Sequence, residues 1–304
     1  MDKQMFTTKD VAEYLSINEK QVYRLIKERR IPATRVTGKW LFPKELVDEW
    51  LIASARENVG ALPRPNPPHN QVVIAGSNDL ALELLTKNLT SQHPGYTVSI
   101  SNVGSLSGLM ALQNGSCHVA ASHLLDFETG EYNSSFIKKH FSTLKITVLN
   151  LAYREQGLIV RKENPPKIKS LRDLAIRKVA FVNRQEGSGT RVLFDYKLQQ
   201  EGIDPSEIDG YSKIASTHME VALSVFGGSA DAGMGIHASA KMLGLDFIPL
   251  ATERFDLIVP NEIISTQPVK ALREVLNSEE FKSTVARMAG YNTRDTGKIM
   301  YERG

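Results

Sequence analysis

Three short segments combine hydroxyl side chains with glycines, the residue types that let backbone N–H groups approach an anion closely. They are Ser-Asn-Asp at 77–79, Gly-Ser-Leu-Ser-Gly at 104–108 and Arg-Gln-Glu-Gly-Ser-Gly-Thr-Arg at 184–191. Each follows an apolar, β-rich run and opens a helical pattern, so we expect each at a helix N-terminus, where free N–H groups and the helix dipole favour negative charge. Singly, each is more often a helix cap than a site. Together, and with an arginine in the third, they predict one shared site for a small anion.

No pattern in the chain points to catalysis or to a metal. There is no P-loop, no G-x-G-x-x-G after a strand and no G-x-S-x-G elbow, and neither His123 nor His218 has a recognisable triad context. The histidines lack zinc-ligand spacing, and the single cysteine, Cys117, excludes a disulfide framework. We therefore expect no enzyme, no metal and no cofactor other than a bound anion. His123, at a strand end, suits a structural hydrogen bond and a place in the cleft equally well.

The elements that would position these residues alternate between strands and helices. β-rich runs at 71–76, 97–104, 118–123, 146–151, 178–183, 230–236 and 245–250 are separated by helical patterns such as 80–89 and 192–200. This alternation predicts an α/β domain with largely parallel sheets, in which ligands bind at the carboxyl ends of strands. The chain has no apolar run long enough to span a bilayer and no secretory leader, so we expect a cytoplasmic protein that does not bind membranes.

A length of 304 residues suggests about two domains, and four prolines within 61–69 suggest where they divide. We expect a small domain at 1–60, a proline-rich linker at 61–70 and a large domain at 71–304. The formal net charge is only +3, yet residues 19–44 hold eight basic residues and two acidic ones. This basic patch indicates a nucleic-acid contact confined to the small domain, the alternative being a merely solvated basic face.

The small domain shows an ordered series of elements. Thr7 or Thr8 can cap a first helix, and Asn18 with Gln21 resembles a capping box that opens a second helix ending at about Arg30. Helical periodicity places three basic side chains of that helix on its exposed face: Lys20, Arg24 and Lys27. Residues 33–42 then form a predicted hairpin with Arg35 and Lys39, and a helix follows whose buried stripe is expected to comprise Leu46, Val47, Trp50 and Leu51.

This order, from FTTKDVAEYL through NEKQVYRLIKERR and ATRVTGKWLF to PKELVDEWL, resembles the excisionase/MerR-type winged helix-turn-helix. The resemblance implies that the second helix meets base edges and phosphates of double-stranded DNA through Lys20, Gln21 and Arg24. It also implies that the wing meets the backbone through Arg35 and Lys39. A module this small covers about one half-site, so we expect a homodimer.

The large domain resembles a type II periplasmic-binding-protein-like domain, and among these it is most similar to members that bind molybdate and tungstate. AGSND, the run from Gly104 to Gly115, HVAASHLLDFETGEYN and VNRQEGSGTR carry the resemblance. It implies two α/β lobes flanking a cleft, with chain crossings near 152–155 and 252–255. Lobe one would comprise about 71–151 and 256–304, and lobe two about 156–251.

The resemblance also implies which side chains bind the ligand. Lobe one would supply Ser77 with Ser105 or Ser107, and lobe two would supply Arg184, Ser188 and Thr190, while Asn78 and His123 are further candidates. Asp79 and Glu186 bear on the ligand's identity, because a fully ionised oxyanion needs donors only, whereas phosphate can use a carboxylate acceptor for its proton. Phosphate gains if either acid enters the cleft.

A DNA-binding module joined to a binding-protein-like domain predicts sensing in place of transport. We expect a one-component transcriptional regulator that senses a small oxyanion, molybdate or tungstate first, through closure of the cleft. The alternatives are a regulator that senses phosphate or a small organic ligand, an excisionase-like architectural DNA-binding protein, and an α/β enzyme acting on an anionic substrate.

Overall fold

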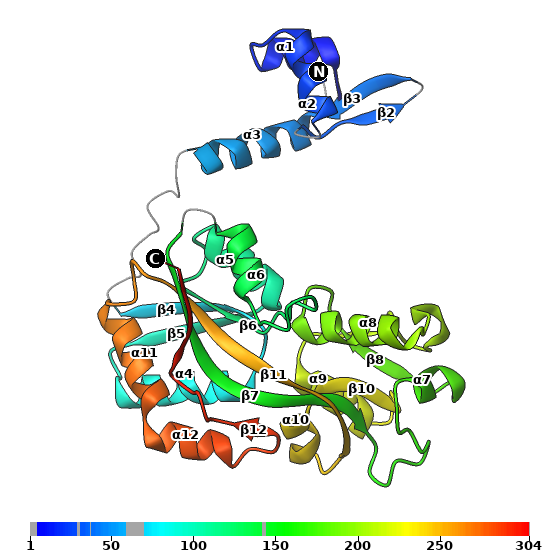
Figure 1. Cartoon of the computed structure of the whole chain (residues 1–304), viewed down its shortest axis with the longest axis vertical. Helices are drawn as coiled ribbons and strands as arrows, with labels where there is room; N and C mark the ends of the chain where they lie inside the picture. The colour runs from blue at the N-terminus through cyan, green and yellow to red at the C-terminus, as the bar shows by residue number, and fades with distance from the viewer. Residues whose placement is uncertain (1–4, 29–30, 37, 59–69, 142–143, 304) are drawn as a thin grey trace. The chain divides into compact units, whose positions relative to one another are not determined.

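The computed structural model describes residues 5–28, 31–36, 38–58, 70–141 and 144–303, and it divides the chain into two compact units. The first is Met1–Arg64 and the second is Pro65–Gly304 (Figure 1). Most of the expected proline-rich linker, residues 61–69, lies outside the described residues. Within the described residues, no helix is both long enough and apolar enough to cross a membrane.

The N-terminal unit is a helix-turn-helix followed by a hairpin and a longer helix. Helix α1 spans Thr8–Tyr14, α2 spans Glu19–Lys27 and α3 spans Lys44–Asn58. Both expected N-caps are confirmed as capping boxes, Thr7 with Asp10 and Asn18 with Gln21. Strands β2 (Thr34–Val36) and β3 (Lys39–Pro43) form the wing, and β1 (Met5–Thr7) adds an edge to β3 that the sequence patterns did not predict.

Two details of this unit differ from expectation. Helix α2 ends at Lys27 with Glu28 as its C-cap, earlier than the expected Arg30. Leu46 is 45% exposed, whereas Val47 is fully buried in the core that Val11, Val22 and Phe42 form. The first turn of α3 therefore rotates Leu46 away from the small core.

The C-terminal unit is built on one ten-stranded sheet within the described residues. Along its main path the strands run β5 (Thr97–Asn102), β4 (Gln71–Gly76), β6 (Val119–Ser122), β11 (Asp246–Pro260), β7 (Ile146–Val160), β10 (Ala232–Ile236), β8 (Phe181–Arg184) and β9 (Ile214–Ala215). Strands β12 (Tyr291–Asn292) and β13 (Ile299–Arg303) pair with β7. The helices are α4 (Leu80–Gln92), α5 (Ser105–Gln113), α6 (Ser134–His140), α7 (Arg172–Ile176), α8 (Gly189–Glu201), α9 (His218–Phe226), α10 (His237–Met242), α11 (Gln267–Asn277) and α12 (Glu279–Ala286), with a short 3₁₀ turn at Pro205–Glu207.

The sheet is parallel only toward its two ends. Strand β4 runs parallel to β5 and β6, and β8 runs parallel to β9 and β10, but the central strands β6, β11, β7 and β10 pair antiparallel. The expectation of largely parallel sheets is therefore wrong at the centre. It treated 146–151 and 245–250 as ordinary short strands, whereas β7 and β11 each run for 15 residues.

These two long strands connect two lobes (Figure 1). Their register runs from Ile146 opposite Pro260 to Val160 opposite Asp246. At one end they carry β4–β6, with α4, α11 and α12 packed on a common core; at the other they carry β8–β10 with α7, α8 and α9. Residues 152–155 and 252–255, where the chain was expected to cross between lobes, lie inside continuous strands.

Candidate functional site

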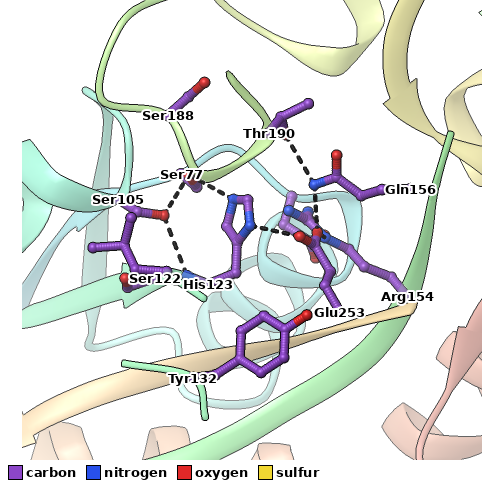
Figure 2. A network of polar contacts seen from close by, with 12 residues as sticks. Ser77, Ser105, Ser122, His123, Tyr132, Arg154, Gln156, Ser188, Thr190 and Glu253 are labelled. Atoms are coloured by element: carbon purple, nitrogen blue, oxygen red, sulfur yellow. Dashed lines mark hydrogen bonds and ion pairs between the residues drawn. The ribbon is translucent and has the colours of Figure 1, made fainter. Parts of the chain in front are cut away.

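Helix N-termini from both lobes meet at one place, where the strands β4, β5 and β8 end. The hydroxyl oxygens of Ser77 and Ser105 lie 2.9 Å apart, although Ser77 precedes α4 and Ser105 is the first residue of α5. Across the lobes, the N–H of Leu106 at the start of α5 donates to the carbonyl of Gly187, at 3.3 Å. The predicted convergence of the three turns is thus present, with Ser77, Ser105, Ser188 and Thr190 all buried around it (Figure 2).

Close packing explains two of the glycines at this junction. A Cβ on Gly189, the first residue of α8, would lie 2.5 Å from the imidazole ring of His123. Gly104 precedes α5 with a φ of +87°, a conformation that other residues rarely adopt, and a Cβ there would lie 3.3 Å from the carbonyl oxygen of Gly187. Glycine at 189 therefore lets the backbone of α8 contact the His123 ring, and glycine at 104 lets two backbone segments from different lobes approach each other.

His123 is the centre of a buried hydrogen-bond network. Its Nε2 lies 3.0 Å from Ser77 Oγ and its Nδ1 lies 2.7 Å from Glu253 Oε2, while its backbone N–H donates to Ser105 Oγ. The ring stacks on Phe255 with centroids 5.3 Å apart. Both of the roles left open for His123 are thus compatible with its position: it makes structural hydrogen bonds and it lies where the lobes meet.

Ser77, His123 and Glu253 stand in the order of a serine–histidine–acid triad, which sequence reasoning did not find. A nucleophile must present its hydroxyl to substrate, however, and Ser77 is only 2% exposed and is bonded to both Ser105 and His123. Glu253 also accepts hydrogen bonds from Arg154 and Gln156. The arrangement fits a network that orients hydroxyl groups.

Arg154 is the largest charged group that sequence reasoning missed. It is fully buried, and its guanidinium donates to Glu253 and to Asp79, the latter at 2.5 Å. Tyr291 also donates to Asp79, at 2.6 Å. Charged residues inside a long apolar strand were the available signal, because Arg154 and Glu253 lie in the two expected crossing segments. The atom Nη2 of Arg154 has no hydrogen-bond partner among the described residues.

Gln156, also missed, joins the network to lobe two. Its Nε2 donates to Glu253 Oε1 at 2.7 Å and to Thr190 Oγ1 at 2.9 Å. Thr190 lies in the first turn of α8, so this amide connects a strand shared by both lobes to a predicted ligand residue (Figure 2).

Arg184 is buried without a counter-ion. Its Nε and Nη2 donate to the carbonyls of Ala215 and Ser216, its Nη1 has no partner, and it forms no ion pair with any described residue. Burial and the repulsion from Arg154 lower the pKa of Arg184 to about 9. Both nitrogens of the buried His218 also lack partners in the described chain. Buried polar atoms without a hydrogen-bond partner are costly unless a ligand or a water molecule bonds to them.

The other residues that the sequence suggested for ligand binding or ligand choice can be compared with the network one by one. Asn78 turns its amide to Glu83, 2.8 Å away, and Ser107 is exposed on α5, so of the pair Ser105 and Ser107 only Ser105 joins the network. Asp79 is buried, but its oxygens already accept from two N–H groups of α4, from Arg154 and from Tyr291. Glu186 is exposed. Asp79 therefore has no free acceptor for a ligand proton, and Glu186 does not enter the network.

In the N-terminal unit the predicted DNA-contacting side chains are all exposed: Lys20, Gln21, Arg24, Lys27, Arg35 and Lys39. Gln21 also accepts the N–H of Asn18 within the capping box, 3.1 Å away, so part of its side chain serves the helix start. Arg35 donates to the carbonyl of Gly38 and lies over the Trp40 ring, which orients it along the wing.

A separate hollow of about 480 Å³ lies beside the network, between the two lobes. The segment after His123 and helix α6 form one wall and α8 forms the other. Phe127 and Tyr196, one from each wall, stack with ring centroids 3.6 Å apart. Its main apolar lining residues are Leu125, Phe127, Phe136 and Tyr196.

Two α/β lobes that share a pair of long strands, with helix N-termini converging between them, define a binding-protein-like ligand domain. The model of the PBP superfamily domain matches residues 86–277, and that of a helix-turn-helix domain matches residues 5–54. The chain belongs to the PBP superfamily and carries an N-terminal helix-turn-helix domain. It is 33% identical to YvgK of Bacillus subtilis (strain 168), described as uncharacterized, with 98% of each chain covered.

Solved structures show the same fold. A protein of Clostridium perfringens with bound phosphate, described as a phosphate ABC transporter substrate-binding protein, has a TM-score of 0.54 at 19% identity, covering 72% of this chain and 98% of that one. The tungstate ABC transporter protein of Geobacter sulfurreducens has a TM-score of 0.52 at 14% identity, with 73% and 99% covered. The two domains resemble binding proteins and DNA-binding modules, not enzymes, and indicate a ligand-sensing DNA-binding regulator.

Proposed function

We propose that the chain is a one-component transcriptional regulator whose C-terminal unit binds a fully ionised oxyanion, molybdate or tungstate first, between its lobes. The observation that carries the proposal is Arg184, a buried guanidinium whose Nη1 has no partner and which forms no ion pair with any described carboxylate; Glu220 and Glu253 attract it only from beyond ion-pair distance. A desolvated cation in this state is stabilised by an anion. A regulator that acts on DNA would work in the cytoplasm.

The donor set supports a ligand without a proton of its own. Four buried hydroxyls surround the site, those of Ser77, Ser105, Ser188 and Thr190. The acceptors of Asp79 are already occupied and Glu186 faces solvent. A site without a free carboxylate suits molybdate, tungstate or sulfate better than hydrogen phosphate, because a carboxylate is the strongest acceptor for the phosphate proton. The fold is shared with proteins described as phosphate and tungstate binders, so the anion class fits the fold.

An anion held by lobe one hydroxyls and by Arg184 of lobe two would stabilise the closed arrangement of the lobes. We propose that closure alters DNA affinity in a homodimer, through differential binding of the ligand to the two states. Arg24 and Lys27 of α2 and Arg35 and Lys39 of the wing are the proposed contacts to double-stranded DNA.

A second candidate ligand is a small organic molecule. The hollow of about 480 Å³ beside the network lies within the size range of small-molecule sites and is lined by the stacked rings of Phe127 and Tyr196. An organic anion could place its charged group on the network and its apolar part in this hollow.

Calorimetric titration of the full chain with molybdate, tungstate, sulfate and phosphate tests the proposal. We expect micromolar or tighter binding of at least one fully ionised anion, lost in Arg184→Ala and retained in Arg177→Ala, which alters a half-exposed arginine of the same lobe paired with Asp173. Binding of none of the four below millimolar concentration would reject the oxyanion and favour the organic ligand.

A further inference from the structure

Four groups at the site form a continuous line of hydrogen bonds. Ser105 Oγ lies 2.9 Å from Ser77 Oγ, Ser77 Oγ lies 3.0 Å from His123 Nε2, and His123 Nδ1 lies 2.7 Å from Glu253 Oε2 (Figure 2). All four residues are at most 2% exposed, so solvent does not complete these bonds. The direction in which each bond points is therefore decided within the line.

Glu253 fixes that direction at one end. Burial acts to raise its pKa, but the charge of Arg154 and the interactions with His123 and Gln156 outweigh burial and lower the pKa to about 2. An ionised carboxylate only accepts, so His123 must carry a proton on Nδ1. In the neutral imidazole, Nε2 is then an acceptor, and the hydroxyl of Ser77 donates a hydrogen bond to it.

The protonation state of His123 thus decides what Ser77 can offer a ligand. With neutral His123, the single hydroxyl proton of Ser77 is used on Nε2 and only oxygen lone pairs remain. When a proton from solvent binds to Nε2, the new N–H donates a hydrogen bond to Ser77 Oγ. The Ser77 hydroxyl no longer donates to His123, so it can donate its hydrogen bond to a ligand oxygen. One proton converts Ser77 from an acceptor into a donor.

We infer that His123 is a specificity-determining residue: a fully ionised oxyanion binds together with one proton that is taken up on His123 Nε2, whereas hydrogen phosphate binds without it. Hydrogen phosphate can donate its own proton to Ser77 Oγ and so leaves His123 neutral. This inference rests on the proposed anion site and adds the proton that accompanies the anion.

The charges around His123 explain why the proton arrives only with the ligand. Burial is the largest effect that lowers the pKa of His123; Glu253 on β11 opposes it, and Arg154 on β7 and Arg184 on β8 add to it.

His218 at the start of α9 is also buried, and burial followed by Arg184 lowers its pKa well below the usual range. The remaining titratable groups around the network do not supply a free charge: Asp79 is bound to Arg154, and burial raises the pKa of Tyr132 and of Tyr291. A fully ionised dianion offsets the two arginines and has no proton of its own to donate to Ser77, so the balance at His123 then favours the proton. Hydrogen phosphate also carries two negative charges, but its own proton satisfies Ser77 Oγ and His123 stays neutral.

Calorimetry of the full chain in buffers of different ionisation enthalpy measures this proton directly. At a pH well above 7, where free phosphate is already hydrogen phosphate, we expect uptake of about one proton with tungstate or sulfate and none with phosphate. The Kd for tungstate should rise about tenfold per pH unit, as one linked proton requires. Tungstate binding without proton uptake would overturn the inference and leave the anion site intact, whereas failure of every anion to bind would overturn both.

Two variants test whether His123 is the residue that takes up the proton when the anion binds. His123→Gln cannot titrate, so tungstate should bind without proton uptake and with a Kd that no longer changes with pH. The control is His237→Gln, because His237 also pairs with a glutamate, Glu155, at 2.9 Å but is half-exposed and lies outside the line. Thermal melting shows that each variant is folded. Proton uptake that persists in His123→Gln, or that disappears in His237→Gln, contradicts the assignment.

Discussion

At the scale of residues, the site differs from an ordinary buried ion-pair cluster in the way its charges are paired. Arg154 forms ion pairs with two carboxylates, those of Asp79 and Glu253, whereas Arg184 forms no ion pair with any residue that the structure describes. Arg154 therefore belongs to the framework that holds the lobes' shared strands, and Arg184 is the arginine that we propose for contact with the ligand.

Arg184→Ala should weaken oxyanion binding by about 2–4 kcal/mol, because it removes a desolvated, charged hydrogen bond. Ser77→Ala should cost roughly 1 kcal/mol, the usual value for a neutral hydrogen bond. Titration of the anion that binds the wild type most tightly gives both values. Full affinity in Arg184→Ala would move the site elsewhere.

Glu253→Gln should destabilise the C-terminal unit by about 3–5 kcal/mol at neutral pH, because it leaves the buried Arg154 with one carboxylate fewer. The pKa of Glu253 is lowered from 4.5 to about 2 in the folded state, so its contribution is complete above 4.5 and declines as the pH falls toward 2. Thermal melting at pH 7 and at pH 2.5 should show the gap between wild type and variant narrowing. Glu279→Gln, at an exposed residue, is the control; an unchanged gap would exclude an ionised Glu253 as its cause.

At the scale of elements, short amphipathic pieces were predictable and the two long strands were not. The capping boxes of α1 and α2, the wing, and the turns before α4, α5 and α8 all follow from local residue types. Strands β7 and β11 could not be predicted whole, because Arg154, Gln156 and Glu253 interrupt their apolar patterns. These side chains hydrogen-bond to one another across the β7–β11 pair, and a local sequence pattern does not contain that pairing.

Local sequence patterns likewise predicted only part of the candidate site. Ser77, Ser105, Arg184, Ser188 and Thr190 were candidates because hydroxyls, glycine and arginine mark helix starts. The partners of His123 come from positions 46 and 130 residues away in the chain, so only the fold brings them together.

The prediction for DNA binding concerns two side chains of helix α2. Arg24→Ala should weaken specific binding by about 1–3 kcal/mol, and Lys27→Ala should mainly lower the salt dependence by about one unit, as loss of a base contact and of a phosphate contact would. Footprinting at several salt concentrations measures both effects. Lys87→Ala, at an exposed lysine of α4, should change neither; unchanged binding in both α2 variants would remove this helix from the interface.

At the scale of the whole molecule, each hydrophobic core lies within one unit. The core around Val22 and Phe42 belongs to Met1–Arg64, and the other clusters belong to Pro65–Gly304. No cluster of the described residues joins the two units, so we expect each unit to be stable without a core shared with the other.

A fragment that begins at Asn70 should consequently fold and bind the same anion with the affinity of the full chain. Calorimetry on the fragment and differential scanning of the full chain test this, and the full chain should show two transitions. Loss of anion binding in a folded fragment would mean that the first unit contributes to the site.

The pair β7 and β11 has a mechanical consequence. Two lobes joined by loops would swing freely about a hinge, but these lobes are joined by two strands that are hydrogen-bonded to each other through the crossing. Opening must then bend this two-stranded ribbon, and we expect the bend at the register shifts 249/251 and 255/256, where the pairing is already irregular. We therefore expect a ligand to act on the curvature of the ribbon and not on the freedom of a joint.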